Sequence, residues 1–425
     1  MMQTQVKQAK EVGMPELERI DCCIVGGGPA GAVLALLLAR QGVPVLLLEE
    51  HKDFDRDFRG DTIHPSVLQI MDEIGLAGRL LQLRHTEMHT MSLEAGGGTI
   101  TPVDFRRLKT RYPYVMMVPQ VDFLNFITVE AARYPQFHLR MNARVEELIE
   151  EDGVIRGVRY RGPDGRHEVR ARLTVGADGR FSRLRKLAGL PPIATSSPMD
   201  VLWFRLPRRP DDAEEAGVRF GAGRLGILLN RFDYWQVGYV IAKGAYQQIR
   251  AAGIEAFRGQ VADLFPELRD RVAALHDWKS LSLLSVESSR LARWYRPGLL
   301  LIGDAAHVMT PVGGVGINYA IQDAVVAANV LGPRLRQGKL RLRDLAAVQQ
   351  QREWPTRIIQ AFQAVIQQRL LGEALQSTDQ FQLPPIARIL LRIPLLRNLP
   401  ARFIAFGVWP VHVKGARARS GPKPS

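Results

Sequence analysis

The sequence predicts an α/β fold, in which a domain built on a parallel sheet is interrupted by a mainly β domain and followed by C-terminal helices. Three observations predict this fold: a glycine-rich turn between an apolar strand and an apolar helix near the N-terminus, a stretch of strand-like segments in the middle of the chain, and the return of an aliphatic strand and a helix after residue 298. The chain has 425 residues, which is enough for roughly two or three domains with sizeable cores.

The first element is a βαβ unit of the kind that binds dinucleotides. Residues 21–25 have the apolar character of a buried strand. Gly26, Gly28 and Gly31 follow as G-x-G-x-x-G, at the point where the strand must turn into a helix. Gly26 permits the tight turn, Gly28 leaves room for a pyrophosphate, and Gly31, next to Ala30, lets the helix pack closely on the sheet.

The helix and the second strand of this unit support the same interpretation. Residues 30–39 are apolar on all sides, so this helix must be buried, and Gly42 ends it. Residues 45–48 are an uninterrupted aliphatic run, which is typical of a parallel strand covered on both faces. Glu49 follows Gly26 by 23 positions, close to the ~20 at which an acid meets a ribose hydroxyl. A glycine-rich turn without a nucleotide is the alternative.

A second G-x-G-x-x-G match, at residues 221–226, is predicted to be a hairpin turn. It lies between two strand-like runs. A strand-rich stretch at 234–241 follows, where a nucleotide-binding unit would need a helix.

The elements between these motifs follow from hydrophobic periodicity and turn residues. In chain order we expect a helix at 65–74, strands at 88–103 around a turn at 96–98, a helix at 121–133, a strand meander at 144–175, a mixed block rich in strands at 199–284, a strand at 299–302 and a helix at 317–331.

Composition places the chain among globular proteins of a reducing compartment. Its 46% hydrophobic and 24% charged residues are ordinary for such proteins. No apolar run reaches the ~20 residues of a membrane-spanning helix, and residues 1–20 are polar without a secretory signal, so a cytoplasmic location is expected. Cys22 and Cys23 are expected to be small buried hydrophobes, without a disulfide or a metal.

The formal charge of +14 is concentrated in the C-terminal segment, where residues 380–425 hold eight Lys or Arg and no acid. These basic residues alternate with aliphatics and prolines and carry no recognition motif, so nucleic acid is not expected as a partner. Arg388 and Arg392 lie one helical turn apart beside a wide aliphatic face. This pattern suggests peripheral attachment to an anionic membrane surface on its cytoplasmic face, and helices packed on the rest of the protein are the alternative.

Two further motifs follow strands where a doubly wound sheet presents its ligand-binding edge. The first spans residues 175–182 and contains Asp178, and the second spans 301–307 and contains Asp304. A glycine-rich loop at 311–318 continues the second motif into a helix. An acid at a strand end can accept hydrogen bonds from sugar-like hydroxyls, and a glycine-rich loop that opens a helix offers bare amides to an electron-rich ligand.

Together these motifs resemble those of the class A, single-component FAD-dependent monooxygenases of the para-hydroxybenzoate hydroxylase fold, over residues 21–331. The resemblance implies a Rossmann-like FAD-binding domain. It assigns the adenosine half of FAD to Gly26, Gly28, Ala30, Gly31 and Glu49, the adenine to the backbone of Val145, the flavin side to Arg59 and Gln120, contacts with both FAD and NAD(P)H to Asp178, the ribityl chain to Asp304, and the isoalloxazine ring to the loop from Pro311 to Asn318, including Ile317.

The resemblance also explains which catalytic groups are missing. No nucleophile with a base, no metal-ligand cluster and no carboxylate pair stands out, and a flavin enzyme needs none because reduced flavin reacts with oxygen. We expect FAD as cofactor, with NAD(P)H and dioxygen as co-substrates. The expected reaction is hydroxylation or epoxidation of an apolar, aromatic, polyketide-like or quinone-like small molecule through a flavin hydroperoxide. Pro311, Gly316 and Asn318 are the expected catalytic residues, and the backbone amides of Gly316, Ile317 and Asn318 can stabilise negative charge on the flavin.

Candidate residues on the substrate side come from the expected inserted sheet, whose inner face should cover the flavin. They are Arg205, Tyr234, Trp235 and Gln236, with His85, His89 and His307 as further candidates, and for each a core or surface role is the alternative. Flavin-dependent halogenases share this fold, but no two of the six tryptophans form their W-x-W signature. The alternatives are a flavin-binding protein without turnover, which sequesters a ligand, or a related flavin oxidoreductase or halogenase, and the oligomeric state stays open.

The resemblance and the element order divide the chain into four parts. They are residues 18–185, the first part of the FAD-binding domain, whose strand segment 85–110 joins the substrate domain; residues 186–290, the substrate domain; residues 291–340, the second part of the FAD-binding domain; and residues 341–425, a basic helical segment.

Overall fold

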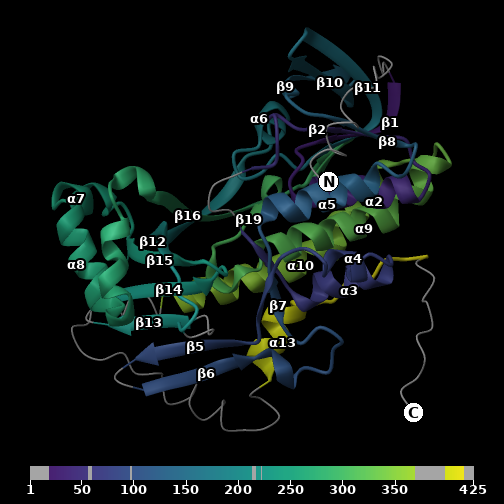
Figure 1. The fold of residues 1–425 in the computed structure, drawn as a ribbon. Helices are drawn as coiled ribbons and strands as arrows, with labels where there is room; N and C mark the ends of the chain where they lie inside the picture. The colour runs from purple at the N-terminus through teal and green to yellow at the C-terminus, as the bar shows by residue number, and fades with distance from the viewer. Residues whose placement is uncertain are drawn as a thin grey trace, which may run out of the picture.

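Two large sheets form two lobes, and helices pack between and around them (Figure 1). The computed structural model describes residues 19–55, 60–95, 98–212, 217–221, 223–368 and 398–415. Arg59, Arg388 and Arg392 lie outside the described residues.

The first sheet is the predicted parallel one, with strand order β17-β18-β11-β1-β2-β8. Its central strand β1 pairs in parallel with β2 and β11, and β11 pairs in parallel with β18. The antiparallel strands β9 and β10 extend it through β11. Its strands are β1 (Arg19–Val25), β2 (Val45–Leu48), β8 (Phe137–Arg140), β9 (Arg144–Glu151), β10 (Val154–Gly162), β11 (Gly165–Gly176), β17 (Tyr295–Arg296) and β18 (Leu299–Leu301).

Helix α2 (Pro29–Arg40) packs against this sheet, and α5 (Gln120–Ala131) and α9 (Gly316–Arg336) pack against α2 (Figure 1). All residues from 30 to 39 are buried, as the uniform apolar pattern predicts. Cys22 and Cys23 are buried free thiols in β1. The fingerprint helix is therefore central to the core, and its N-terminus meets the edge where β1 and β11 end.

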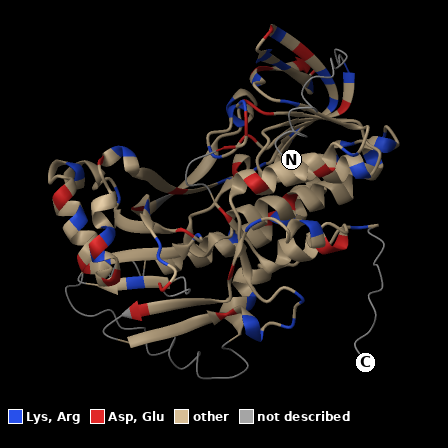
Figure 2. Ribbon diagram, in the orientation of Figure 1, with Lys and Arg blue, Asp and Glu red and all other residues tan. Residues whose placement is uncertain are grey.

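The strand extension at the far end of this lobe carries charges of both signs (Figure 2). Arg159 of β10 pairs with Glu147 of β9 and Glu168 of β11 across the sheet. Arg170 pairs with Glu151 in the same way. Cross-strand pairs of opposite sign support the strand pairing. Since the arginines named here are paired with glutamates, this extension has a surface of mixed charge.

The second sheet has the order β19-β16-β12-β15-β14-β13-β5-β6 and forms the other lobe. Its β13 and β14 meet in the hairpin predicted at the second glycine-rich match, with Gly221 opposite Arg224. The helices α7 (Tyr246–Ala251) and α8 (Ile254–Leu264) flank this lobe. Its strands are β5 (Thr90–Ala95), β6 (Gly98–Asp104), β12 (Pro192–Pro207), β13 (Gly217–Gly221), β14 (Arg224–Asn230), β15 (Tyr234–Ala242), β16 (Ser282–Leu291) and β19 (His307–Val308).

A small sheet of β3 (Thr62–Ile63), β7 (Val115–Met117) and β4 (Thr86–Met88) connects the lobes, beside α3 (Pro65–Glu73) and α4 (Ala77–Leu80). The C-terminal helix α13 (Leu399–Phe406) packs here, with Ala401 and Ala405 buried among residues of β6 and β7.

The long helix α10 (Leu342–Ile366) lies along α9. Among the helices of the described ranges, none combines the length and apolar content needed to cross a membrane.

Candidate functional site

The three fingerprint glycines have different surroundings. Gly26 has φ +103°, and a Cβ there would lie 2.4 Å from the carbonyl oxygen of Ala177. A Cβ on Gly31 would lie 2.0 Å from the carbonyl oxygen of Gly26. A Cβ on Gly28 would meet no protein atom within 4 Å. The first and third glycines are therefore required by the fold itself, whereas Gly28 faces space of the kind that a pyrophosphate needs.

Glu49 is fixed beside this turn, at the end of β2. It is 7% exposed, its Oε2 accepts a hydrogen bond from the Gly27 amide at 2.8 Å, and its Oε1 accepts one from the His51 amide at 3.0 Å. The backbone carbonyl of Glu49 accepts from the Ala143 amide at 2.8 Å, which brings Val145 of β9 close to the same edge. Val145 follows this contact by two residues along the chain.

Asp178 follows β11 and contacts the first turn of the next helix, α6 (Arg183–Leu187), whose N-cap residue is Ser182. Its carboxylate accepts hydrogen bonds from the Ser182 hydroxyl at 2.6 Å and the Leu184 amide at 3.0 Å. Burial raises its pKa, although these hydrogen bonds act in the opposite direction. Sequence reasoning missed this capping contact, whose signal is the serine four positions after the acid.

A fully buried charge cluster lies directly behind Asp304. Asp323 of α9 accepts from the Gly303 amide at 3.0 Å and lies 2.6 Å from His307 Nε2, and its other oxygen accepts from Arg352 Nε at 2.8 Å. The three side chains are at most 2% exposed. Burial alone would raise the pKa of Asp323, but His307 and Arg352 lower it overall. Asp323 was missed, and its signal was a lone acid in an apolar helix.

His307 therefore has the structural role that was given as its alternative, because its ring contacts Asp323 in the core. His85 and His89 also have local partners: His85 Nδ1 lies 2.7 Å from the Leu83 carbonyl, and His89 Nε2 lies 3.1 Å from Glu87.

The loop from Pro311 to Asn318 turns on two glycines with positive φ, Gly313 at +79° and Gly314 at +62°. The Asn318 side chain accepts from the His64 amide at 3.0 Å and donates to the Gly314 carbonyl at 3.3 Å. Thr62 also donates to this carbonyl, at 3.0 Å. The Asn318 side chain therefore holds the loop, and the backbone amides at the start of α9, from Gly316 on, remain the groups that can serve a ligand.

His64 connects this loop to the C-terminal helix, because its Nδ1 lies 2.8 Å from the carbonyl oxygen of Ile404. Burial lowers the pKa of His64 from 6.5 to about 4. In the unfolded chain the imidazole takes up a proton at a higher pH, so the stability that a neutral His64 contributes is fully present above pH 6.5 and is lost as the pH falls toward 4.

We therefore expect His64→Gln to flatten the acid side of the stability curve. The lowering of the His64 pKa from 6.5 to about 4 corresponds to ~3 kcal/mol of unfolding free energy, which the wild type loses between these two pH values and the variant keeps. Urea unfolding at a series of pH values measures it for both proteins. Parallel curves for wild type and variant would contradict the assignment.

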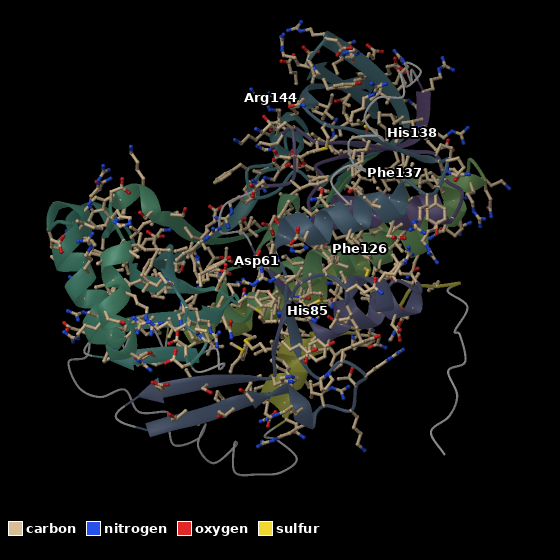
Figure 3. All side chains as sticks on the ribbon, viewed as in Figure 1. Asp61, His85, Phe126, Phe137, His138 and Arg144 are labelled. Atoms are coloured by element: carbon tan, nitrogen blue, oxygen red, sulfur yellow. The ribbon has the colours of Figure 1, made fainter. Side chains whose placement is uncertain are left out.

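An ion pair that the sequence did not indicate joins the two lobes near Gln120. Arg231 Nη2 lies 2.7 Å from Asp61 Oδ2, and Arg231 Nε donates to Gln236 Oε1 at 2.9 Å. The backbone N–H of Gln120 donates to Asp61 Oδ1 at 3.1 Å. Burial raises the pKa of Asp61, against the effect of Arg231. Figure 3 places Asp61 where the lobes meet.

Three of the candidate substrate residues share one face of the second sheet. Arg205 of β12 pairs with Gln236 of β15, and side chains alternate between faces along a strand. Tyr234 lies on the same face, with its ring centre 4.9 Å from the Arg205 guanidinium. This face also carries Trp203, which packs in a cluster with Val312 of the glycine-rich loop.

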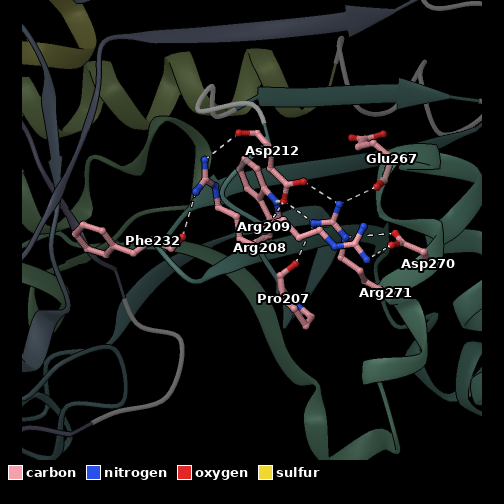
Figure 4. A network of polar contacts seen from close by, with 9 residues as sticks. Pro207, Arg208, Arg209, Asp212, Phe232, Glu267, Asp270 and Arg271 are labelled. Atoms are coloured by element: carbon pink, nitrogen blue, oxygen red, sulfur yellow. Dashed lines mark hydrogen bonds and ion pairs between the residues drawn. The ribbon is translucent and has the colours of Figure 1, made fainter.

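Trp235 lies on the opposite face. It is 3% exposed, packs with Phe257 of α8, and donates from Nε1 to Asp212 at 2.9 Å. Asp212 is also the partner of Arg271 in a network around the edge of this lobe (Figure 4). Trp235 therefore has the core role that was its alternative, because its neighbours are the lobe's own core.

The comparisons with known proteins agree on one family. A family model described as "FAD binding domain" matches residues 19–360. The 6-methylpretetramide 4-monooxygenase of Streptomyces rimosus is 36% identical over 389 residues, which cover 91% of this chain and 92% of that enzyme. The anhydrotetracycline monooxygenase of Streptomyces rimosus is 31% identical over 325 residues, covering 72% of this chain and 61% of that enzyme. The solved structure of p-nitrophenol 4-monooxygenase PnpA from Pseudomonas putida DLL-E4 has a TM-score of 0.71 at 21% identity and covers 92% of this chain and 95% of that one.

Proposed function

Since this chain belongs to the family of FAD-dependent class A monooxygenases, we propose that it hydroxylates a ring carbon of a polycyclic aromatic polyketide phenol. The chain is an FAD-dependent oxidoreductase that inserts one oxygen atom, with NAD(P)H as the co-substrate typical of the family. The substrate class is the proposed part. It is supported by relatives named for tetracyclic substrates and by the apolar face of the second sheet.

The observation that carries the proposal is the contact between this face and the glycine-rich loop. Trp203, Leu225 and Val240 form one apolar cluster, against which Val312 of the loop packs. An apolar sheet face set against the loop that would line the flavin suits a fused-ring ligand, while polar groups such as Tyr234 and Gln236 would fix its orientation.

The residues present fit FAD. Gly28 and the start of α2 would take the pyrophosphate, Glu49 the ribose, Asp304 the ribityl chain, and the amides of Gly316 and Ile317 the ring edge. When bound, FAD supplies the redox chemistry between NAD(P)H and dioxygen. The protein's own contribution is to hold the ring with preorganised amides and to exclude water from the apolar face.

Oxidation of NAD(P)H by the purified FAD-loaded protein tests this function. We expect 6-methylpretetramide, or a related tetracyclic phenol, to accelerate NAD(P)H oxidation and to gain one oxygen atom, which mass spectrometry detects. A ligand that binds without oxidation of NAD(P)H would favour a binding protein without turnover. Acceleration only by single-ring phenols would overturn the polycyclic substrate class.

Asp178 is the residue that we propose to contact both FAD and NAD(P)H. We expect Asp178→Asn to slow flavin reduction by NAD(P)H about tenfold, the effect of one charge-assisted hydrogen bond, with less effect on oxygen insertion by enzyme that is already reduced. Stopped-flow absorbance separates the two half-reactions. Ser182→Ala is the control, because it disturbs the same helix cap without removing the charge. A normal reductive half-reaction in Asp178→Asn would refute this role.

We further propose that the protein works in the cytoplasm and that its basic C-terminal segment attaches to anionic membranes. Exposed aromatic residues of α10 and the end of the chain support this: Trp354 is 65% exposed and Trp409 is 71% exposed. Such side chains suit a lipid interface.

Co-sedimentation with anionic liposomes tests the attachment. A truncation would remove α13, whose Ala401 and Ala405 are buried, so charge reversal of Arg388 and Arg392 to Glu is the better variant. We expect salt-sensitive sedimentation of the wild type, weakened in the double variant by ~1 kcal/mol or more for each charge. Equal sedimentation of both proteins would refute membrane attachment through the basic C-terminal segment.

A further inference from the structure

Helix α10 presents a buried polar face to the backbone that surrounds the FAD motifs. Gln349, Arg352, Gln360 and Gln363 recur at intervals of three, eight and three residues, which places them on one side of the helix. Each is at most 8% exposed. A buried polar face is costly unless its groups are hydrogen-bonded, so the partners of these side chains indicate what the face does.

The partners are mainly backbone groups on both sides of Asp304. Gln349 donates to the Ala292 carbonyl at 2.9 Å and accepts from the Trp294 amide at 2.9 Å. Gln360 donates from Nε2 to two carbonyls, those of Ser289 and Val308, each at 2.9 Å.

Gln363 makes the corresponding bridge at the glycine-rich loop. Its Nε2 donates to the carbonyl of Thr310 at 2.9 Å and to that of Val312 at 2.8 Å. These carbonyls flank Pro311, which has no N–H of its own. A primary amide has two N–H donors, so one Gln363 side chain satisfies both carbonyls and fixes the distance between them. Gln363 is 1% exposed, which shields both bonds from water.

We propose that Gln363 is a positioning residue for the loop from Pro311 to Asn318. By holding the carbonyls of Thr310 and Val312, it sets the start of the turn through Gly313 and Gly314, whose other end Thr62 and Asn318 hold at the Gly314 carbonyl. The inference rests on the proposed role of this loop beside the flavin ring. It gives α10, to which the sequence assigned no chemistry, a part in the active site.

The matched variants are Gln363→Leu and Gln360→Leu. Each removes one side-chain amide that bridges two carbonyls from the same helix face, one turn apart, and each leaves two buried carbonyls without that donor. Only Gln363 acts on the loop. A loss of general stability should therefore affect both variants, whereas a loss of loop position should affect Gln363→Leu alone.

Hydrogen exchange of the FAD-loaded full-length chain provides a readout that needs no turnover. In Gln363→Leu we expect the amides of residues 312–318 to exchange about tenfold faster or more, and in Gln360→Leu we expect them to exchange as in wild type. A second readout is the fraction of consumed NAD(P)H that yields hydroxylated product instead of hydrogen peroxide, which should fall in Gln363→Leu and not in Gln360→Leu.

The outcomes separate the two proposals. Unchanged loop exchange in Gln363→Leu, or an equal increase in both variants, would overturn the positioning role. Faster loop exchange in Gln363→Leu alone supports it, even if no polycyclic phenol is hydroxylated, and in that case only the proposed substrate class fails. Selective loop exchange without a change in product yield would overturn the link between loop position and oxygen insertion.

Discussion

Replacing Gly28 by valine should remove FAD from the purified protein without unfolding it. The backbone of Gly28 has φ −68° and ψ −178°, which valine adopts without strain, and a Cβ there meets no protein atom within 4 Å. The added methyl groups would instead occupy the space of the pyrophosphate. Loss of two or more charge-assisted hydrogen bonds corresponds to a loss of affinity on the order of 100-fold or more.

Flavin absorbance after desalting and circular dichroism measure the two parts of this prediction. Gly259→Val is the matched control, because this glycine also has no protein atom within 4 Å of its Cβ position, on the distant helix α8. Full flavin retention in Gly28→Val would refute the assignment of the first loop. Gly26 and Gly31 are poor test sites, since a side chain at either would collide with the protein's own backbone.

Asp323→Ala should cause the largest loss of stability among the substitutions considered. It leaves the Arg352 guanidinium buried without its carboxylate partner and removes the acceptor of the Gly303 amide. Breaking a buried pair in this way typically costs about 3–5 kcal/mol. Because Gly303 precedes Asp304, we also expect weaker FAD binding, and chemical unfolding and FAD titration measure the two effects.

Asp212→Ala is the matched control for this prediction. Asp212 pairs with the buried Arg271 in the second lobe, and its Oδ1 accepts from Arg271 Nη2 at 2.8 Å (Figure 4). Its loss should reduce stability but leave the affinity for FAD unchanged. If both variants lost FAD affinity to the same extent, the Asp323 cluster would have no specific role in holding the Asp304 motif.

Residue patterns predicted the local elements well, and strand alternation could also have divided the substrate-side candidates into two groups. The hairpin at 221–226 was predicted from its flanking strands and is confirmed by the pairing of β13 with β14. In contrast, Tyr234, Trp235 and Gln236 could never all have faced one ligand, because adjacent residues of a strand point to opposite faces. Alternation alone would have separated Trp235 from the other two.

The sequence by itself determined the parallel sheet, the fingerprint turn and the position of Glu49, because strand period, helix period and glycine conformation act over a few neighbouring residues. The tertiary structure alone decided which distant side chains support the site. Asp323 meets Arg352, Asp61 meets Arg231, and Gln363 reaches across to the loop at Pro311. These contacts join residues tens to hundreds of positions apart, so they exist only after the lobes and helices have packed, and no local pattern encodes them.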